Sequence, residues 1–239
     1  MIPKIIHLCW FGGGPMSPLH RKCVDSWRKY CPDYEIRTWN ERNTDLDNEY
    51  CRAAIQRRKW AFVSDWARFD ILYRHGGVYL DTDIELIRPI DDLLGLGGCV
   101  NVQETARAVS SGVIACEAGD PVIGRARQLI LDELIPKHLF VASPLILQRA
   151  LDLDGGATNH TLPSKTFFPF NPYDHDIDPN PRQLMYGDIT PATYGIHHYR
   201  LGAEWADSRP KRALARALGL LGLRLRWRIA YDAFGAAAA

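Results

Sequence analysis

The sequence has no long uncharged apolar run, no paired-cysteine motif and no large excess of either charge. Of its 239 residues, 46% are hydrophobic and 24% are charged, with a net charge of +1. No segment approaches the roughly 18 apolar residues of a membrane-spanning helix. The near-neutral total gives no indication of nucleic acid, so we expect no nucleic-acid partner. The apolar fraction excludes a disordered chain and suffices for one large folded core.

The six cysteines stand at irregular spacings and form no C-x-x-C pair. This pattern excludes a zinc ribbon or thioredoxin-type motif and predicts free thiols in a reducing compartment. The segment Met1–His7 lacks the basic start, apolar run and small-residue cleavage site of a signal peptide. We therefore expect a cytoplasmic protein.

Apolar runs and helical periodicity alternate along the first third of the chain, as they do in a parallel α/β sheet. A buried strand is expected over residues 4–11, and a second strand over 34–39. Between them, Ser17 and the proline after it are typical of a helix start. The clearest helical pattern covers residues 60–75 and is followed by two glycines, a usual helix end.

The later part of the chain predicts shorter elements. Residues 152–191 are rich in Pro, Asn, Asp and Gly, and we expect them to be mostly loop. The other elements expected are helices over 46–56, 120–134 and 144–151 and strands over 78–80, 84–87, 98–103, 112–116 and 194–199.

The strongest local signal is a pair of carboxylates, Asp81 and Asp83, directly after the apolar strand at 78–80. Ligands of α/β folds bind at the carboxyl ends of the strands. Residues i and i+2 of an extended segment point to the same side, so both carboxylates can converge on one cation. Oxygen ligands of this kind favour Mg²⁺ or Mn²⁺. The alternative is an exposed acidic turn.

The preceding helix carries a second charged pair. Asp65 and Arg68 are three residues apart and therefore share one helix face. They are either an ordinary surface ion pair of small energetic value or groups that bind sugar hydroxyls or a phosphate.

Three blocks of sequence occur in an order that is typical of one enzyme family: IPKIIHLCWFG at 2–12, SDWAR at 64–68 and LYRHGGVYLDTD at 72–83. Together they resemble the D-x-D sugar transferases of glycosyltransferase family 32, which includes capsular-polysaccharide and mannosyl- or galactosyltransferase-like proteins. A more distant similarity runs to the clostridial glucosylating toxins. The resemblance implies an α/β GT-A fold, Rossmann-like, with a mixed, mostly parallel central sheet and helices on both faces. We expect this domain over 1–207 and a basic amphipathic tail over 208–239.

The resemblance also implies roles for individual residues. Trp10 matches the aromatic residue that stacks on the nucleotide base, and His7 belongs to the same cofactor-binding block. Asp65 and Arg68 match the pair that holds the donor sugar hydroxyls. The alternative for Trp10 is a place in the core, where tryptophan is often well buried.

The same resemblance implies a metal site. Asp83 matches the usual direct ligand, while Asp81 matches a residue that contacts ribose or reaches the metal through water. A late His block followed by a Trp completes the site in the family. The segment GIHHY with Trp205 resembles it, so His197 is the expected third ligand and His198 the runner-up. The alternative for His197 is a structural histidine. Two carboxylates and an imidazole are a reasonable set for Mn²⁺.

Three positions depart from the family pattern: Ser111, Ser143 and Glu204 stand where relatives often carry Asn, Gly and Ser. These positions help to shape the donor-sugar and acceptor pockets, so the sugar remains open. They also leave as an alternative a catalytically weak nucleotide-sugar or glycan-binding domain. A D-x-D phosphotransferase is the remote alternative, because its motif requires Thr or Val in place of Glu85.

The segment 209–231 combines a stripe of leucines with seven basic residues and no acidic residue. A basic amphipathic helix of this kind lies on anionic membrane surfaces. We therefore expect peripheral contact with the inner face of the plasma membrane. The alternative is a C-terminal helix that packs on the domain with a solvated basic face.

The sequence therefore predicts a metal-dependent hexosyltransferase that moves a sugar from a nucleotide-sugar donor to a glycan or lipid-linked acceptor. UDP-sugars are the first expectation, because Trp10 resembles the uracil-stacking residue, and GDP-mannose is the second. The residues expected to carry the reaction are Asp65, Arg68 and Asp83. The resemblance further implies retention of anomeric configuration and a place in surface polysaccharide synthesis.

Overall fold

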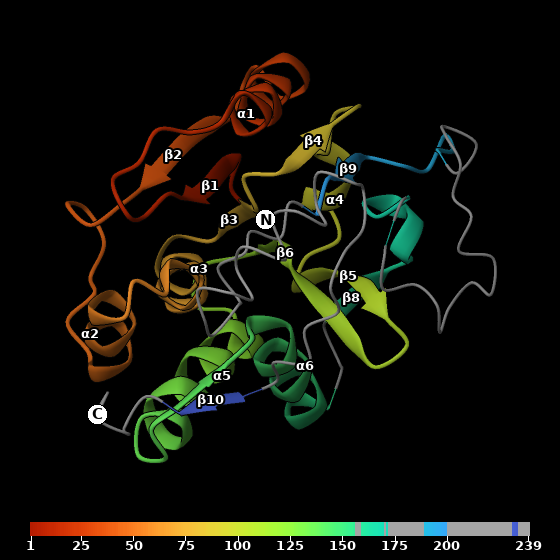
Figure 1. Ribbon diagram of the computed structural model, residues 1–239. Helices are drawn as coiled ribbons and strands as arrows, with labels where there is room; N and C mark the ends of the chain where they lie inside the picture. The colour runs from red at the N-terminus through yellow and green to blue at the C-terminus, as the bar shows by residue number, and fades with distance from the viewer. Residues whose placement is uncertain (156–158, 170, 172–188, 200–230, 234–239) are drawn as a thin grey trace.

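A six-stranded mixed sheet forms the centre of the protein in the computed structural model (Figure 1). The structure describes residues 1–155, 159–169, 171, 189–199 and 231–233. Along the sheet the order is β2 (Glu35–Trp39), β1 (Ile5–Cys9), β3 (Gly77–Leu80), β6 (Ala108–Cys116), β5 (Cys99–Thr105) and β8 (Asn159–Leu162). Five of these strands run in one direction, and β6 runs against them. The expected mixed and mostly parallel sheet is therefore confirmed.

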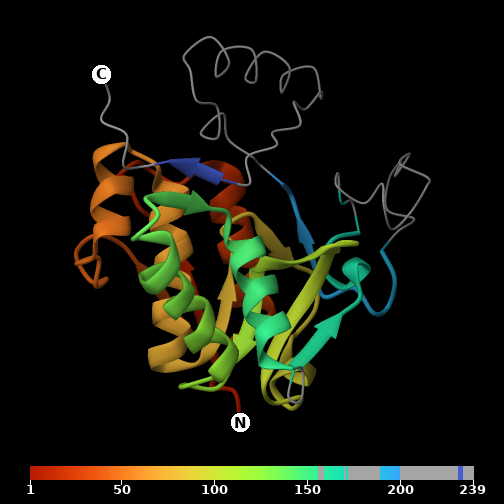
Figure 2. The ribbon, with the colours of Figure 1, turned by 90° about the horizontal axis from the view of Figure 1, so that it is seen from below.

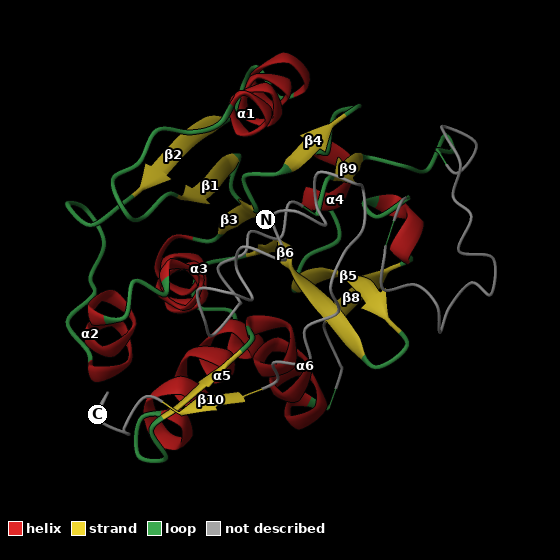
Figure 3. Ribbon diagram, in the orientation of Figure 1, coloured by secondary structure: helices red, strands yellow, loops and turns green. Residues whose placement is uncertain are grey.

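Helices cover both faces of this sheet (Figure 3). One face carries α2 (Glu49–Gln56), α3 (Trp60–His75), α5 (Pro121–Leu129) with a π-helical extension at Ile130–Leu134, and α6 (Ser143–Asp154). The other face carries α1 (Pro18–Tyr30), α4 (Asp91–Leu94), a short 3₁₀ turn at Ser164–Thr166, and a small sheet of β4 (Ile84–Leu86) with β9 (Gly195–His197).

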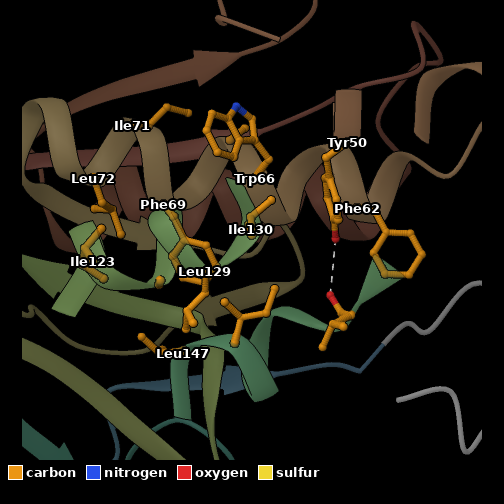
Figure 4. Close-up of a cluster of buried hydrophobic side chains, with 14 of the residues drawn as sticks. Tyr50, Phe62, Trp66, Phe69, Ile71, Leu72, Ile123, Leu129, Ile130 and Leu147 are labelled. Carbon is orange, nitrogen blue, oxygen red and sulfur yellow. Dashed lines mark hydrogen bonds between the residues drawn. The ribbon is translucent and has the colours of Figure 1, made fainter. Parts of the chain in front are cut away.

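The inner strands β1, β3 and β6 are buried along almost their whole length because both faces of the sheet are covered. In β1, Ile6 and Leu8 pack towards α1, while Cys9 packs towards α3. Figure 4 shows part of the larger cluster, including Phe62, Trp66 and Phe69 of α3. In this cluster the rings of Phe62 and Phe140 stack with 4.6 Å between their centres. This dense packing fixes α3, the helix that carries Asp65 and Arg68.

The local signals in the sequence locate most elements correctly. The predicted bounds of α3 are confirmed, and the Ser17 hydroxyl caps α1, which begins at a proline. Gly76 closes α3 with a φ of 62°, a left-handed conformation that favours glycine. The six cysteines are all free and buried: Cys9, Cys23, Cys31, Cys51, Cys99 and Cys116. The expectation of free thiols is thus confirmed.

Three strands were not predicted. β8 lies inside the segment 152–191, so the expectation of loop is wrong there; its sequence, Asn-His-Thr-Leu, is polar because it is an edge strand with partly exposed residues. The other two, β7 (Leu139–Val141) and β10 (Tyr231–Ala233), pair with each other antiparallel. In Figure 2, the blue strand β10 lies beside the green strand β7.

The predicted C-terminal tail lies almost wholly outside the described residues. Of residues 208–239, only Tyr231–Ala233 are described, as the strand that pairs with β7. None of the helices in the described part of the chain combines the length and apolar content that crossing a bilayer requires.

Candidate functional site

A cluster of acidic residues and one histidine lies just beyond the carboxyl end of β3. The Asp81 amide donates to the Gly112 carbonyl over 2.8 Å, and the Ile84 amide then donates to the Asp81 carbonyl over 2.9 Å. This turn leads into β4, where Ile84 is opposite His197 of β9. The register therefore brings His197 close to Asp83, which lies 114 positions earlier in the chain.

The cluster has the composition and the spacing of a cation site. Asp81, Asp83 and His197 each offer one ligand atom, and these atoms lie within 4.8 Å of one another. The Nε2 atom of His197 is 3.1 Å from Oδ1 of Asp83. The Nδ1 atom of His197 is buried and has no hydrogen-bond partner among the described residues. The two carboxylates suit Mn²⁺ or Mg²⁺, which prefer oxygen ligands, and a neutral imidazole can act as the third ligand.

Electrostatics within the cluster act on His197. Burial by itself would lower the pKa of His197, but Asp83, Asp81 and Glu104 outweigh burial and raise it. The carboxylates around His197 therefore stabilise a positive charge at this position. Glu104 was not predicted to belong here; its own pKa is raised by burial and lowered in part by His197.

Asp81 is held on one carboxylate oxygen. Its Oδ1 atom accepts a hydrogen bond from the Tyr79 hydroxyl over 3.1 Å and lies 3.3 Å from Nη1 of Arg68. Its Oδ2 atom lies against Gly112, where a Cβ atom would come within 2.6 Å of it. Gly112 thus leaves the room that the Asp81 carboxylate requires.

Asp65 and Arg68 form a buried ion pair, so the interpretation as a surface ion pair is wrong. They are 3% and 5% exposed, and Oδ1 of Asp65 is 2.9 Å from Nη2 of Arg68. The Ser143 hydroxyl donates to Asp65 Oδ1, and the Ser143 amide donates to Oδ2 over 3.2 Å. Burial raises the pKa of Asp65, while Arg68 and Ser143 oppose that rise by stabilising the carboxylate.

Arg68 connects this pair with the acidic cluster. Its Nη1 atom donates to the Ser111 carbonyl over 2.7 Å and to the Ser111 hydroxyl over 3.2 Å. Its guanidinium also lies 4.6 Å from the centre of the Tyr79 ring. The same nitrogen faces Asp81, so one guanidinium spans the distance from Asp65 to the edge of the sheet.

His7 does not join the cluster. It is 0% exposed, its Nε2 atom is 2.8 Å from the Gly76 carbonyl, and its Nδ1 atom accepts from the Trp39 indole over 3.0 Å. Burial lowers the pKa of His7 to about 4, so the ring is neutral. The structure gives His7 two protein partners at the amino end of β3, away from the carboxylates that follow its other end.

Three predicted residues remain: Trp10, His198 and Trp205. Trp10 follows β1 at the carboxyl edge of the sheet, half-buried, and its indole donates to the Gly14 carbonyl over 2.6 Å. His198 faces Glu85, with 2.9 Å between Nε2 and Oε2, and therefore points away from Asp83. Trp205 lies outside the described residues.

Sequence reasoning did not assign Tyr79, Ser111, Ser143 and Gly112 to this site as partners of the charged residues. Ser111 and Ser143 were noted as departures from the family pattern, which was the available signal. Their hydroxyls are 2.7 Å apart and link α6 to β6. The contact itself could not be predicted, because it joins segments 32 residues apart.

Comparison with known proteins agrees with this arrangement. Residues 17–96 match the model of the glycosyltransferase sugar-binding region containing the DXD motif. The chain thus contains a DXD glycosyltransferase region. Its Asp81 and Asp83 lie within the matched residues, whereas His7, Trp10 and His197 lie outside them.

Two relatives of this glycosyltransferase region are similar over about half of the chain. An uncharacterized glycosyltransferase of Acanthamoeba polyphaga mimivirus is 30% identical over 132 residues, 51% of this chain and 53% of the relative. Inositol phosphoceramide mannosyltransferase 3 of Schizosaccharomyces pombe is 29% identical over 131 residues, 51% of this chain and 35% of the relative. The chain therefore spans about half, or less, of the length of these relatives.

A solved structure shares the fold. The PaToxG glycosyltransferase superposes with a TM-score of 0.52 at 19% identity and covers 64% of this chain and 70% of its own. The chain therefore has a GT-A fold, as predicted.

Proposed function

We propose that this protein is a metal-dependent glycosyltransferase that transfers a sugar from a nucleotide-sugar donor to a glycan or lipid-linked acceptor. The observation that carries the proposal is the convergence of Asp81, Asp83 and His197 within 4.8 Å at the carboxyl end of β3. Because these residues follow a DXD glycosyltransferase pattern on a GT-A fold, nucleotide-sugar chemistry explains the cluster better than an acidic surface turn does.

In this proposal, Asp83, His197 and Asp81 hold Mn²⁺ or Mg²⁺. A bound dication stabilises the charge that develops on the leaving diphosphate without a proton transfer. Arg68 contributes a fixed positive charge beside Asp81, and Trp10 stands at the same edge of the sheet as a stacking surface for the base. Orientation of the donor would then bring the anomeric carbon close to the acceptor hydroxyl.

The donor and acceptor are part of the proposal. UDP-sugars remain the first choice because Trp10 resembles a uracil-stacking residue. GDP-mannose is the second, and the name of the fission-yeast mannosyltransferase supports both a mannosyl donor and a lipid acceptor. We also propose retention of anomeric configuration and a place in surface polysaccharide synthesis, as the family resemblance implies.

The test is release of nucleoside diphosphate from a panel of pure UDP- and GDP-sugars, with Mn²⁺ and with chelator. We expect one donor to be turned over only with metal. The Asp83→Ala variant should lose at least about a hundredfold of that rate, since loss of charge stabilisation removes several kcal/mol. Asp132→Ala, at an exposed carboxylate on the π-helical turn, is the matched control. Tight donor binding without release would instead indicate the binding-domain alternative.

We further propose that segment 209–231 brings the protein to the anionic inner face of the plasma membrane from the cytoplasm. The seven basic residues and the leucine stripe of its sequence support this. Removing the tail would also remove β10, so a variant with all seven basic residues changed to Gln is the sharper test. Pelleting of the unaltered chain with anionic vesicles, and loss of pelleting in this variant, is the expected result. Equal pelleting of both would exclude the proposal.

A further inference from the structure

Two serines lie where the buried ion pair meets the sheet. Ser143 opens α6 and directs both its amide and its hydroxyl at the Asp65 carboxylate. Ser111, on β6, accepts from Arg68 through its carbonyl and its hydroxyl. Each serine is 2% exposed, and their hydroxyls are 2.7 Å apart. Among the described residues, the hydrogen-bond donors to the Asp65 carboxylate are Arg68 and Ser143.

This arrangement divides the guanidinium of Arg68 between two carboxylates. Nη2 faces Asp65 at 2.9 Å, and Nη1 faces Asp81 at 3.3 Å. Because Ser143 also donates to Asp65, the carboxylate does not depend on Arg68 alone for hydrogen bonds. Ser111 accepts from Nη1 and keeps that nitrogen on the side of Asp81. Buried hydrogen bonds to charged groups are strong and directional, so those of the two serines restrict the position of the Asp65–Arg68 pair.

The position of Arg68 bears on Asp81, because Oδ1 of Asp81 has Arg68 and Tyr79 as its partners while Oδ2 lies against Gly112. With one oxygen engaged by protein, the carboxylate presents the other in a fixed direction. Groups that orient a ligand in this way normally change metal affinity about 10- to 100-fold when they are removed.

We propose that Ser111 and Ser143 are positioning residues of the metal site, which act through Asp65 and Arg68 to orient the Asp81 carboxylate. This inference rests on the proposed function for its metal, and it differs from the role that the family resemblance implies. In that role Asp65 and Arg68 hold the donor sugar. Here each oxygen of Asp65 has a protein partner, so the pair also acts as an internal support for Asp81.

The test measures Mn²⁺ dissociation constants by electron paramagnetic resonance of free Mn²⁺, without any donor. Ser143→Ala and Ser111→Ala keep every charge and each remove one hydroxyl, and we expect each to weaken Mn²⁺ binding about threefold or more. Ser143→Thr keeps the hydroxyl and should retain more affinity than Ser143→Ala. Ser164→Ala is the matched control, since Ser164 is 6% exposed and its hydroxyl has no partner within the described residues. Thermal melting verifies that the variants are folded.

A second measurement separates the internal support from a sugar contact. The ratio of the dissociation constants of UDP and a UDP-sugar, at saturating Mn²⁺, reports contacts to the sugar alone. Weaker Mn²⁺ binding with an unchanged ratio supports the proposal. An unchanged or tighter Mn²⁺ constant in both serine variants, or a change confined to the ratio, overturns it. If the serine variants overturn this proposal while the unaltered chain still binds Mn²⁺ and turns over a donor, the proposed function stands. If the unaltered chain does not bind Mn²⁺, both the proposed function and this inference are overturned.

Discussion

Two histidines at opposite ends of β3 differ in their hydrogen-bond partners and in the direction of their pKa shifts. His7, at the amino end, has one protein partner on each ring nitrogen, both from uncharged groups. His197, beyond the carboxyl end, faces the Asp83 carboxylate with one nitrogen, and its other nitrogen has no partner among the described residues. The pKa of His7 is lowered to about 4, and that of His197 is raised.

The difference shows that the neighbouring groups distinguish a structural histidine from a candidate metal ligand: uncharged groups surround His7, and carboxylates surround His197. Burial is the largest influence on both pKa values and lowers each of them. Only His197 has carboxylates close enough to reverse the direction. A neutral imidazole with two satisfied nitrogens stabilises the fold, whereas an imidazole between carboxylates can exchange its proton for a cation.

The largest expected effect tests the comparison at His197, the histidine proposed to bind the metal. His197→Ala removes one of the three proposed ligands, and we expect Mn²⁺-dependent donor turnover to fall at least about a hundredfold. His198→Ala is the matched control, because His198 faces Glu85 and should change the rate only a few-fold. Steady-state rates at saturating Mn²⁺ give the answer. If both variants lost the same fraction of the rate, the assignment of His197, and not His198, as the metal ligand would be contradicted.

The next effect concerns His7 and the pH dependence of stability. The unfolded chain binds a proton at His7 near the ordinary pKa of about 6.5, whereas the folded chain resists it down to about 4. Stability should therefore fall as the pH decreases from 6.5 towards 4, by at most about 3 kcal/mol, and should not change on this account above 6.5.

Urea unfolding at pH 7 and pH 4.5 measures this effect. His7→Gln loses hydrogen bonds at both pH values but has no titrating ring, so its stability should decrease less between them than that of the unaltered chain. The difference between the two slopes isolates His7 from other acid effects. Parallel slopes would show that His7 titrates normally in the folded protein.

The smallest effect concerns the Asp81 carboxylate, which lies at the same end of β3 as His197. A Cβ atom on Gly112 would come within 2.6 Å of Oδ2 of Asp81, a distance that requires the carboxylate to move. Gly112→Ala should weaken Mn²⁺ binding about tenfold, in the range of other changes that reorient a ligand. Gly95→Ala is the control, because its new Cβ would meet its nearest neighbour at 3.8 Å. Identical Mn²⁺ constants for both variants would argue against a close fit at Asp81.

Local patterns predicted the elements that carry the site. The apolar run before Asp81, the helix over 60–75 and the glycines between them are all signals within a few residues of one another, and the structure has each element where expected. β8 and the β7–β10 pair were missed, because their residues form strands through partners up to 94 positions away and carry weak local signals.

The role of Ser143 illustrates the same limit at the level of one side chain. The sequence shows only a serine before a proline at the start of a helix. Its two hydrogen bonds to Asp65 join residues 78 positions apart, and they exist because α6 packs against β6 on the face where α3 lies. No spacing rule connects such positions, so the contact becomes visible only in the folded chain.

By itself the sequence determined that two carboxylates would follow a buried strand at the carboxyl edge of an α/β sheet, because alternation and turn chemistry are properties of neighbouring residues. Only the tertiary structure decided which histidine meets them. Adjacent residues of a strand point to opposite sides, and the register of β9 on β4 turns His197 towards Asp83 and His198 towards Glu85. That register depends on packing between distant segments, and so does the placement of Asp65 and Arg68 in the interior.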